Sequence, residues 1–317
     1  MSQVVRIRFV VERNYAGWRL DAYLQQKLRR LAAEKIPGLI AERLETEDGS
    51  SVAPDSLVVP GFAFALLKDV EPEPDTPLDF GVIHDDGMLL VVDKPAGLPV
   101  HPTARYFAHT FTSVARARYP QWKIDPAHRL DRETSGLLAC GTAPEWTKAL
   151  KRSFADGRVQ KRYLALTAGW PADDRFEVDA PLALTLQSEV RVRMHVHPEG
   201  QASRTAFVVL ERRTAPDGAR IALVACEPRT GRQHQIRAHL LHAGTPIVGD
   251  KIYGPDELIF DRFTKRALTP ADHAALRLPR QALHASTLTI PHPATGEPVA
   301  LEAPLPPDLA GLWGGCT

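Results

Sequence analysis

Apolar residues in the first 68 positions alternate in some stretches and follow helical spacing in others. Residues 3–11 (QVVRIRFVV) alternate in part and predict a strand. A helix is expected to start near Arg19–Leu20, because apolar residues continue at helical spacing as far as Leu31. The pieces SLVVPG and FAFALL, over 56–67, predict short strands. The pattern therefore predicts a small N-terminal α+β unit.

Beyond residue 78, apolar runs typical of strands outnumber those typical of helices. The run 88–100 predicts a strand that enters a Pro/Gly turn, and DGAR and PHPATGE are hairpin signals. Consecutive strands indicate an α+β class with a mixed or antiparallel sheet. The other strands are expected at 161–169, 190–197, 204–212, 220–226, 282–290 and 298–304.

Two helices are predicted in this larger region. Residues 144–156 begin with a proline, carry apolar residues on one face and are followed by Gly157. The second helix is expected at 232–243, with Thr230 as its N-cap and Gly244 as its stop. Both helices interrupt the series of strands without changing the predicted class.

A proline-rich, acidic stretch separates the two regions. Residues 69–78 (DVEPEPDTPL) hold three prolines and four acids in ten positions, which predicts a linker. A length of 317 residues also suggests two domains. We therefore expect an N-terminal module at 1–68 and a larger domain at 79–317.

Charge is unevenly distributed, although the whole chain carries a formal net charge of only +1. Residues 1–39 hold eight bases and three acids, residues 40–90 hold two bases and twelve acids, and residues 91–317 hold 29 bases and 23 acids. The total argues against a strongly basic coat protein and against an acidic disordered chain. The uneven charge suggests that the segments have different functions, and it makes most of the large domain basic.

Composition also bounds the class of protein. No run approaches the roughly 18 apolar residues of a membrane helix, and the charged N-terminus does not resemble a signal peptide. Cys140, Cys226 and Cys316 are too few and too far apart to indicate a disulfide framework or a cysteine zinc site. These features predict a globular protein of a reducing compartment.

The stretch HRLDRETSGLLACG (128–141) is the most informative one for chemistry. Asp131 lies among His128, Arg129 and Arg132, just before a turn and an apolar strand. A carboxylate beside guanidinium groups should have a lowered pKa, which suits a nucleophile or a base. A surface ion pair on a loop explains the same residues, and composition alone does not decide between the two.

Two further stretches favour a functional site. Tyr163 stands early on a predicted strand next to Lys161, where its ring can face a nucleotide base. Residues 229–240 (RTGRQHQIRAHL) hold three arginines and two histidines, which suits phosphate binding, although a solvated helix face is the alternative. His234 and His239 do not have the spacing of a metal pair on a helix, so they are interpreted as surface or site-lining groups.

Common cofactor motifs are missing from the sequence. It contains neither of the glycine-rich phosphate-binding patterns and no nucleophile elbow of the G-x-S-x-G kind. The sequence therefore gives no support for a phosphate-cradle or dinucleotide site.

Six co-linear motifs resemble those of RluA-type pseudouridine synthases, which isomerise specific uridines in RNA. The resemblance covers about 80–300, and the family needs no cofactor. The matching stretches are 93–101 (DKPAGLPVH), 128–136 (HRLDRETSG), 161–165 (KRYLA), 230–239 (TGRQHQIRAH), 246–254 (PIVGDKIYG) and 283–285 (LHA).

The resemblance implies a role for individual residues. Asp131 matches the catalytic aspartate, Tyr163 the tyrosine that stacks on the target uracil, and Arg237 the arginine that holds the aspartate. Arg129 matches the residue that enters the RNA stack after base flipping, and Ile236 is expected to line the uracil pocket. The remaining candidate RNA contacts are His128, Arg132, Lys161, Arg232 and His234.

The N-terminal unit resembles a degenerate α-L (S4-like) RNA-binding module. GWRLDAYL at 17–24 matches its opening helix, but the second helix with its Ser-Arg pair is missing from 36–50 (IPGLIAERLETEDGS). The acidic residues 40–75 would repel phosphate, so RNA contact is expected only through the basic side at 6–35. A purely structural role for this unit is an equal alternative.

The resemblance implies a cytoplasmic, monomeric enzyme whose partner is RNA. Large-subunit (23S) ribosomal RNA is the favoured substrate and transfer RNA is the alternative. A non-catalytic RNA-binding relative and a glycosidase-type hydrolase are the competing functions. An RNA-binding relative would not require a carboxylate such as Asp131 within the motifs. A glycosidase-type hydrolase normally requires two catalytic carboxylates, and the motifs offer no second one.

Overall fold

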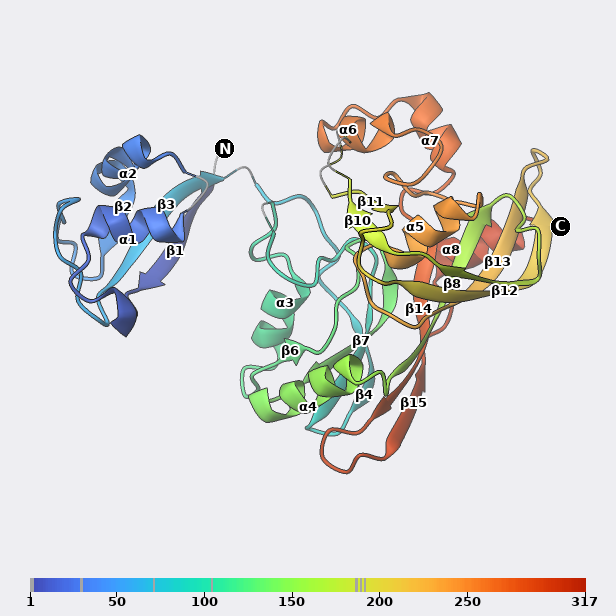
Figure 1. Cartoon of the computed structure of the whole chain (residues 1–317), viewed down its shortest axis with the longest axis horizontal. Helices are drawn as coiled ribbons and strands as arrows, with labels where there is room; N and C mark the ends of the chain where they lie inside the picture. Colours follow the sequence, from blue (N-terminus) through green and yellow to red (C-terminus); the bar gives the residue numbers. More distant parts are fainter. Residues whose placement is uncertain are drawn as a thin grey trace. The chain divides into compact units, whose positions relative to one another are not determined.

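The chain forms two compact units, Met1–Pro74 (unit 1) and Asp75–Thr317 (unit 2), whose boundary lies inside the predicted linker. The computed structural model in Figure 1 describes residues 3–28, 31–70, 72–103, 105–185, 188, 190 and 192–317. The last strand of unit 1 continues to Val70, so the first residues of 69–78 are strand and not linker.

Unit 1 is a three-stranded antiparallel sheet packed against two helices. The strand order is β1-β3-β2, and leucine, isoleucine and tyrosine side chains of both helices meet the sheet in one apolar cluster. The strands are β1 (Gln3–Val10), β2 (Leu44–Thr46) and β3 (Ala63–Val70), and the helices are α1 (Leu20–Lys27) and α2 (Ile36–Arg43).

Three expectations for unit 1 are wrong. The first helix ends at Lys27 and not at Leu31, yet Leu28 and Leu31, beyond its end, still pack against the core. A second helix, α2, is present where none was expected, because Pro37 occupies its first turn, where a missing N–H costs nothing. Residues 56–61 form no strand, and only an isolated bridge joins Leu57 to Arg19.

Unit 2 is built on a ten-stranded mixed sheet, which confirms the predicted α+β class. The strand order is β4-β5-β7-β14-β8-β13-β12-β9, with β15 beside β14 and β6 beside β7. The strands are β4 (Gly81–Asp85), β5 (Leu89–Lys94), β6 (Asp125–Pro126), β7 (Ser135–Gly141), β8 (Gln160–Ala168), β9 (Arg175–Asp179), β12 (Arg204–Thr214), β13 (Arg220–Pro228), β14 (Leu283–Pro291) and β15 (Pro298–Glu302).

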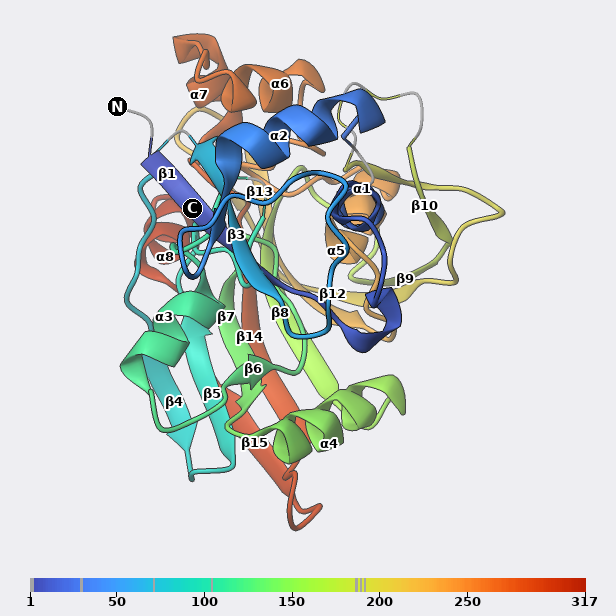
Figure 2. The ribbon, with the colours of Figure 1, turned by 90° about the vertical axis from the view of Figure 1, so that its left-hand side faces the viewer.

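Packing places α3 and α4 on opposite faces of the β5–β7 part of this sheet, and Figure 2 shows the two helices beside these strands. Alternate residues of β5 and β7 pack with Leu150 of α4, and the intervening residues pack with Phe111 of α3. Burial on both faces explains why these strands are continuous apolar runs. The helices of unit 2 are α3 (Phe111–Arg118), α4 (Pro144–Ala155), α5 (Gln235–His242), α6 (Leu258–Thr264), α7 (Pro270–Leu276) and α8 (Pro307–Gly314).

Two predicted elements of unit 2 are shorter than expected. The strand expected at 190–197 is only β11 (Met194–Val196), which pairs with β10 (Leu182–Leu184), and Arg191 lies outside the described residues. The helix expected at 232–243 begins at Gln235. Helices α3, α6, α7 and α8 were not predicted, because seven or eight residues are too few to establish a period.

The three cysteines are free and buried, which agrees with the absence of a predicted disulfide framework. Cys140 and Cys226 have no exposed surface, and Cys316 is 5 % exposed. Among the described residues, no helix is long and apolar enough to cross a membrane.

Gly136 allows β7 and β14 to pair in parallel at the centre of the sheet. Its φ is +107°, and a Cβ atom there would lie 2.3 Å from the carbonyl oxygen of Ala285. We expect Gly136→Ala to lower the free energy of unfolding by about 2–5 kcal/mol. The cost of the positive φ and the cost of the clash with the Ala285 backbone both contribute to this loss. Urea unfolding at equilibrium measures this change.

Gly218 provides the control for this substitution. Its φ is +82°, but a Cβ atom there meets nothing within 4 Å. Gly218→Ala should therefore cost only about 1–2 kcal/mol, from the backbone conformation alone. Equal losses in the two variants would contradict a special role for the Gly136 contact.

Candidate active site

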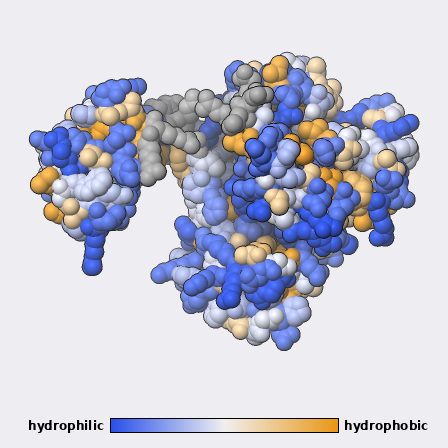
Figure 3. All heavy atoms as spheres, in the orientation of Figure 1, coloured by the Kyte–Doolittle hydropathy of each residue, from blue (hydrophilic) through white to orange (hydrophobic). Residues whose placement is uncertain are grey.

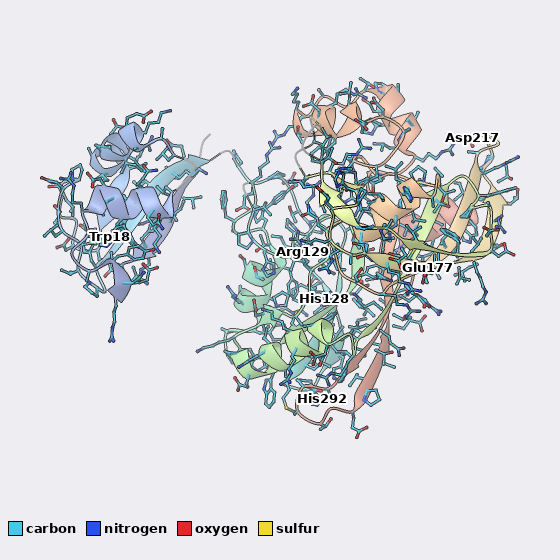
Figure 4. All side chains as sticks on the ribbon, in the orientation of Figure 1. Trp18, His128, Arg129, Glu177, Asp217 and His292 are labelled. Carbon is cyan, nitrogen blue, oxygen red and sulfur yellow. The ribbon has the colours of Figure 1, made fainter. Side chains whose placement is uncertain are left out.

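Strand pairing brings two predicted site segments together at the centre of the unit 2 sheet. Gly136 of β7 pairs with Ala285 of β14, and Ala285 pairs in turn with Tyr163 of β8. The loop that carries Asp131 ends directly before β7, so it lies beside the first half of β8. Figure 4 labels His128 and Arg129 on this loop.

The loop, the start of β8 and the turn before α5 line one cavity of about 910 Å³. Nine of the ten predicted site residues are among its lining residues, and the exception is Arg132. The nine are His128, Arg129, Asp131, Lys161, Tyr163, Arg232, His234, Ile236 and Arg237.

One guanidinium group lies between two carboxylates at the floor of the cavity. Arg237 donates from Nη1 to Asp131 Oδ2 at 2.8 Å, and from Nε and Nη2 to the two oxygens of Asp250 at 2.6 and 2.9 Å. The Arg237 side chain is 5 % exposed, Asp250 is fully buried and Asp131 is 20 % exposed. Arg237 therefore fixes Asp131 in place while leaving it accessible from the cavity.

Asp250 holds Arg237 and was not predicted as a site residue. Its Oδ1 also accepts hydrogen bonds from the backbone N–H groups of Ile252 and Tyr253, at 2.9 and 3.0 Å. The Tyr253 ring lies 5.0 Å from the Arg237 guanidinium carbon, in a cation–π contact. The only signal in the sequence was the acid of the motif at 246–254, to which no role was attached.

Asp131 is held in its ionised form. Burial alone would raise the pKa of Asp131, but His234, Arg237 and the hydrogen bond from Arg237 lower it overall. Burial and the nearby Arg237 lower the pKa of His234 to about 4, so its ring is neutral at neutral pH. The charge that keeps Asp131 ionised at neutral pH is therefore that of Arg237.

The side chain of Tyr163 packs against two apolar clusters of unit 2. Its ring contacts the apolar cluster of β8, β12 and β13 and also the cluster that contains Leu130 and Ala285. Burial, followed by the carboxylate of Asp131, raises the pKa of the Tyr163 hydroxyl. Tyr163 is therefore a neutral phenol at neutral pH, with a ring at the cavity wall.

Arg132 does not flank Asp131, which corrects its predicted place in the site. Its guanidinium donates to the Tyr106 hydroxyl at 2.5 Å and to Glu133 Oε1 at 2.7 Å, away from the cavity. Lys251 donates to the other oxygen of Glu133 at 2.9 Å. These contacts make Arg132 an anchor of the loop that carries Asp131.

The backbone of the same loop is held by a buried lysine that the prediction missed. Lys94 has no exposed surface, and its Nζ donates to the carbonyl oxygens of Pro95, Leu98 and Arg132 at 2.8, 2.9 and 3.2 Å. The N–H of Gly97 donates to the same Arg132 carbonyl at 2.8 Å. Burial lowers the pKa of Lys94 to about 7. The end of β5 and the turn that follows it therefore fix the loop that carries Asp131.

His128 and Arg129 differ in accessibility although they are adjacent. His128 Nε2 accepts a hydrogen bond from the backbone N–H of Ala139 at 3.0 Å, and the ring packs on Phe154. Its nitrogen is thus engaged by the protein. Arg129 is exposed, lines the cavity and has no hydrogen bond or ion pair with any residue that the structure describes.

Lys161, Arg232 and Ile236 lie along the cavity wall in different environments. Lys161 is half-buried, its Nζ lies 3.5 Å from the Thr230 carbonyl oxygen, and burial lowers its pKa. Arg232 is exposed, with Nε donating to the Ala202 carbonyl at 3.1 Å. Ile236 is 6 % exposed and packs in the core of α5 and β8.

Two expectations for the stretch 229–240 are wrong. His239 is neither a surface nor a site-lining group. It is fully buried, with Nδ1 at 2.9 Å from Thr205 Oγ1 and Nε2 at 3.0 Å from the Ala180 carbonyl oxygen. Thr230 is not the N-cap of α5, because its hydroxyl instead donates to Gln235 Oε1 at 2.7 Å, and His234 occupies the cap.

The cavity rim is basic. Among its lining residues are six arginines and lysines but only two acids, Asp131 and Glu227. Glu227 is shared by Arg162 and Arg229, at 2.8 and 3.5 Å. The described residues contain no group of three or more His, Cys, Asp or Glu side chains that could hold a metal ion.

A held, ionised aspartate lies beside a tyrosine ring in a cavity whose charged lining residues are mostly arginine and lysine, an arrangement that suits a polyanionic ligand. Comparisons with known proteins give the family. A family described as RNA pseudouridylate synthase matches residues 88–242. Ribosomal large subunit pseudouridine synthase D of Nitrosomonas europaea is 34 % identical, with 96 % of this chain and 86 % of that protein covered.

Another relative and a solved structure agree with this result. Ribosomal large subunit pseudouridine synthase C of Vibrio vulnificus is 31 % identical over 93 % of this chain and 91 % of its own. The structure of human RNA pseudouridylate synthase domain containing 1 aligns with a TM-score of 0.61 and 27 % identity, covering 77 % of this chain and 91 % of that one. The chain belongs to the RNA pseudouridylate synthase family. It is an RNA pseudouridine synthase, an isomerase whose partner is RNA.

Proposed function

We propose that this synthase isomerises uridine in large-subunit (23S) ribosomal RNA with Asp131 as its catalytic group. The observation that carries the catalytic assignment is the Asp131 carboxylate, held by Arg237 at 2.8 Å and accessible from a basic cavity. The substrate class is supported by relatives that are named ribosomal large subunit synthases and cover nearly the whole chain. A cytoplasmic monomer is part of the same proposal.

The reaction breaks the bond from uracil N1 to the ribose, rotates the base and joins C5 to the ribose. The C5 proton is lost and N1 gains one, so nothing is oxidised and no water is consumed. An ionised Asp131 can add to the anomeric carbon or remove a proton from ribose C2. Either step requires the nucleotide to leave its stack, at a cost of about a few kcal/mol.

The other predicted site residues receive roles that suit their surroundings. The Tyr163 ring stacks on the flipped uracil, and the raised pKa of its hydroxyl favours a neutral hydrogen-bonding group over a phenolate base. The exposed Arg129 enters the space that the base leaves, and Ile236 borders the uracil. Arg232 and Lys161 bind phosphate at the rim. His128 and Arg132 are removed from the RNA contacts, since the protein engages both.

Unit 1 is proposed to be a degenerate α-L module that adds little to RNA binding. Four of the six described bases at 6–35 form ion pairs within the unit, which leaves few charges for phosphate. The pairs are Arg6–Glu45, Arg8–Glu47, Arg19–Asp21 and Lys27–Glu12. The face of unit 2 that Figure 3 turns to the viewer is mostly hydrophilic, with apolar patches among the polar residues.

A direct test uses the purified full-length protein and two RNA pools. We expect pseudouridine to appear in a large-subunit ribosomal RNA transcript and not in a pool of unmodified transfer RNA, as mapped by chemical labelling and primer extension. Modification of transfer RNA alone would contradict the proposed substrate. Binding without modification of either RNA, or of total RNA from a deletion strain, would indicate a non-catalytic relative.

A further inference from the structure

We propose that His234 is a second positioning residue for the catalytic carboxylate. Its ring is fixed by Tyr253 so that Nε2–H faces Asp131 Oδ2, which leaves Oδ1 as the oxygen presented to the nucleotide. This inference rests on the proposed catalytic role of Asp131. It assigns to His234 a function inside the site that differs from the RNA contact expected from its sequence.

The backbone at His234 is in an unusual conformation that brings its ring back toward the loop of Asp131. Its φ and ψ are 54° and 18°, in the left-handed region, at the residue before α5. Only two other non-glycine residues in the described part of the chain, Arg266 and Arg277, have a positive φ. Such a conformation costs about 1–2 kcal/mol for a residue with a Cβ atom, and the surrounding contacts must compensate for it.

Tyr253 determines which nitrogen of His234 carries the proton. The Tyr253 oxygen accepts a hydrogen bond from the backbone N–H of Met194 at 2.8 Å, and it lies 3.0 Å from His234 Nδ1. No other acceptor for the Tyr253 proton is found among the described residues. The hydroxyl therefore donates to Nδ1, and a neutral ring must carry its own proton on Nε2.

The protonated nitrogen then faces the oxygen that Arg237 already holds. His234 Nε2 lies 3.9 Å from Asp131 Oδ2, while Arg237 Nη1 lies 2.8 Å from the same atom. A separation of 3.9 Å is longer than a hydrogen bond, but catalytic contacts often shorten when substrate binds. Asp131 Oδ1 accepts no hydrogen bond from any described residue. Two donors on one oxygen thus orient the other toward the cavity.

The ring acts as a neutral donor and not as a second cation. The His234 side chain is 9 % exposed, and burial with the nearby Arg237 lowers its pKa to about 4. The other charged groups that face it are Asp131, Asp250 and Arg129. Because its ring is neutral at neutral pH, His234 acts on the carboxylate as a hydrogen-bond donor and adds no further full positive charge beside Arg237.

Two substitutions of His234 distinguish the function of Nε2 from that of Nδ1. His234→Asn keeps an oxygen near Nδ1 for the Tyr253 hydroxyl and tolerates the left-handed backbone, but it loses the donor toward Asp131. His234→Gln places an amide nitrogen near Nε2. We expect His234→Asn to lower kcat by about 10–100-fold with unchanged RNA affinity, and His234→Gln to recover a substantial part of this loss.

Tyr253→Phe provides an independent check on the tautomer. It removes the hydroxyl that sets the proton on Nε2, so kcat should fall without a change in RNA affinity. The double variant with His234→Asn should lose no more than the larger single loss, because the two residues act in series. His273→Asn, at an exposed position on α7, is the matched control and should leave kcat unchanged.

Two results would overturn the inference. One is a wild-type kcat in His234→Asn, and the other is weaker RNA binding with an unchanged kcat, which would make His234 an RNA contact. Retained turnover in Asp131→Asn is a different failure, since it would reject the proposed function itself. Thermal unfolding of each variant separates loss of orientation from loss of folding.

Discussion

Asp131→Asn is expected to abolish pseudouridine formation while RNA affinity stays within about threefold of the wild type. Asparagine has the same shape and can still accept a hydrogen bond from Arg237, but its amide is neither a nucleophile nor a base. Removing a catalytic carboxylate usually costs about 10⁴-fold or more in kcat. Loss of one negative charge beside the arginine-rimmed cavity should not weaken phosphate binding.

This prediction requires binding and turnover to be measured on the same RNA. Filter binding gives the affinity, and single-turnover release of label from a C5-tritiated transcript gives the rate. Asp173→Asn makes the same chemical change at an exposed position and should behave as the wild type. Turnover of Asp131→Asn above about 1 % of the wild-type rate would contradict the catalytic assignment.

Arg237→Met is expected to affect both activity and folding. Without the guanidinium, Asp131 loses the only side-chain hydrogen-bond donor that it has among the described residues, so kcat should fall by about 10³-fold. Asp250, fully buried, also loses its ionic partner. An unpaired buried charge destabilises a protein by about 3–5 kcal/mol, and denaturant unfolding at pH 7 should report a loss of this size.

The pH dependence of this loss follows from the carboxylates that Arg237 neutralises. In the wild type, Arg237 lowers the pKa of both Asp131 and Asp250 against the effect of burial. A lowered carboxyl pKa stabilises the fold above the unfolded-state value of about 3.9, and the stabilisation is lost as pH falls through the folded-state value. In Arg237→Met, the effect of burial is opposed only by His234 and Arg129 at Asp131 and by two backbone hydrogen bonds at Asp250, so both pKa values rise. The stability gap should therefore be widest above about pH 5 and narrow below it.

A second substitution distinguishes orientation from folding. Asp250→Asn removes the charge that Arg237→Met leaves buried and unpaired, so the double variant should regain much of the lost stability. It should not regain activity, because Asp131 still has no Arg237. Recovery of both properties would mean that Arg237 contributes to the reaction only through folding.

The sequence predicted which residues gather in the cavity better than it predicted what those residues contact. Asp131 and Tyr163 lie close together because β14 pairs with both β7 and β8, and Arg237 of α5 then reaches Asp131. Arg132 was misplaced because adjacency in sequence does not mean adjacency on one face of a loop. His239 was expected at the surface because its hydrogen-bond partners, Thr205 and Ala180, are far from it in the sequence.

The residues that hold the site could not be predicted from local patterns. Asp250 is 13 residues from Arg237, and Lys94 is 38 residues from Arg132, so only the folded sheet brings them together. The missed α2 has a different cause. Pro37 and Gly38 look like helix breakers, and only the burial of Ile36 and Ile40 makes the helix stable.

The burial of all three cysteines makes the protein a convenient host for a spectroscopic probe. Thiol reagents should not reach Cys140, Cys226 or Cys316 in the folded state. A cysteine introduced at the cavity rim, for example at Thr289, would then be the single labelled position without removal of any native residue. A fluorophore there would sense a nucleotide as it enters the cavity, so base flipping could be timed separately from the chemistry.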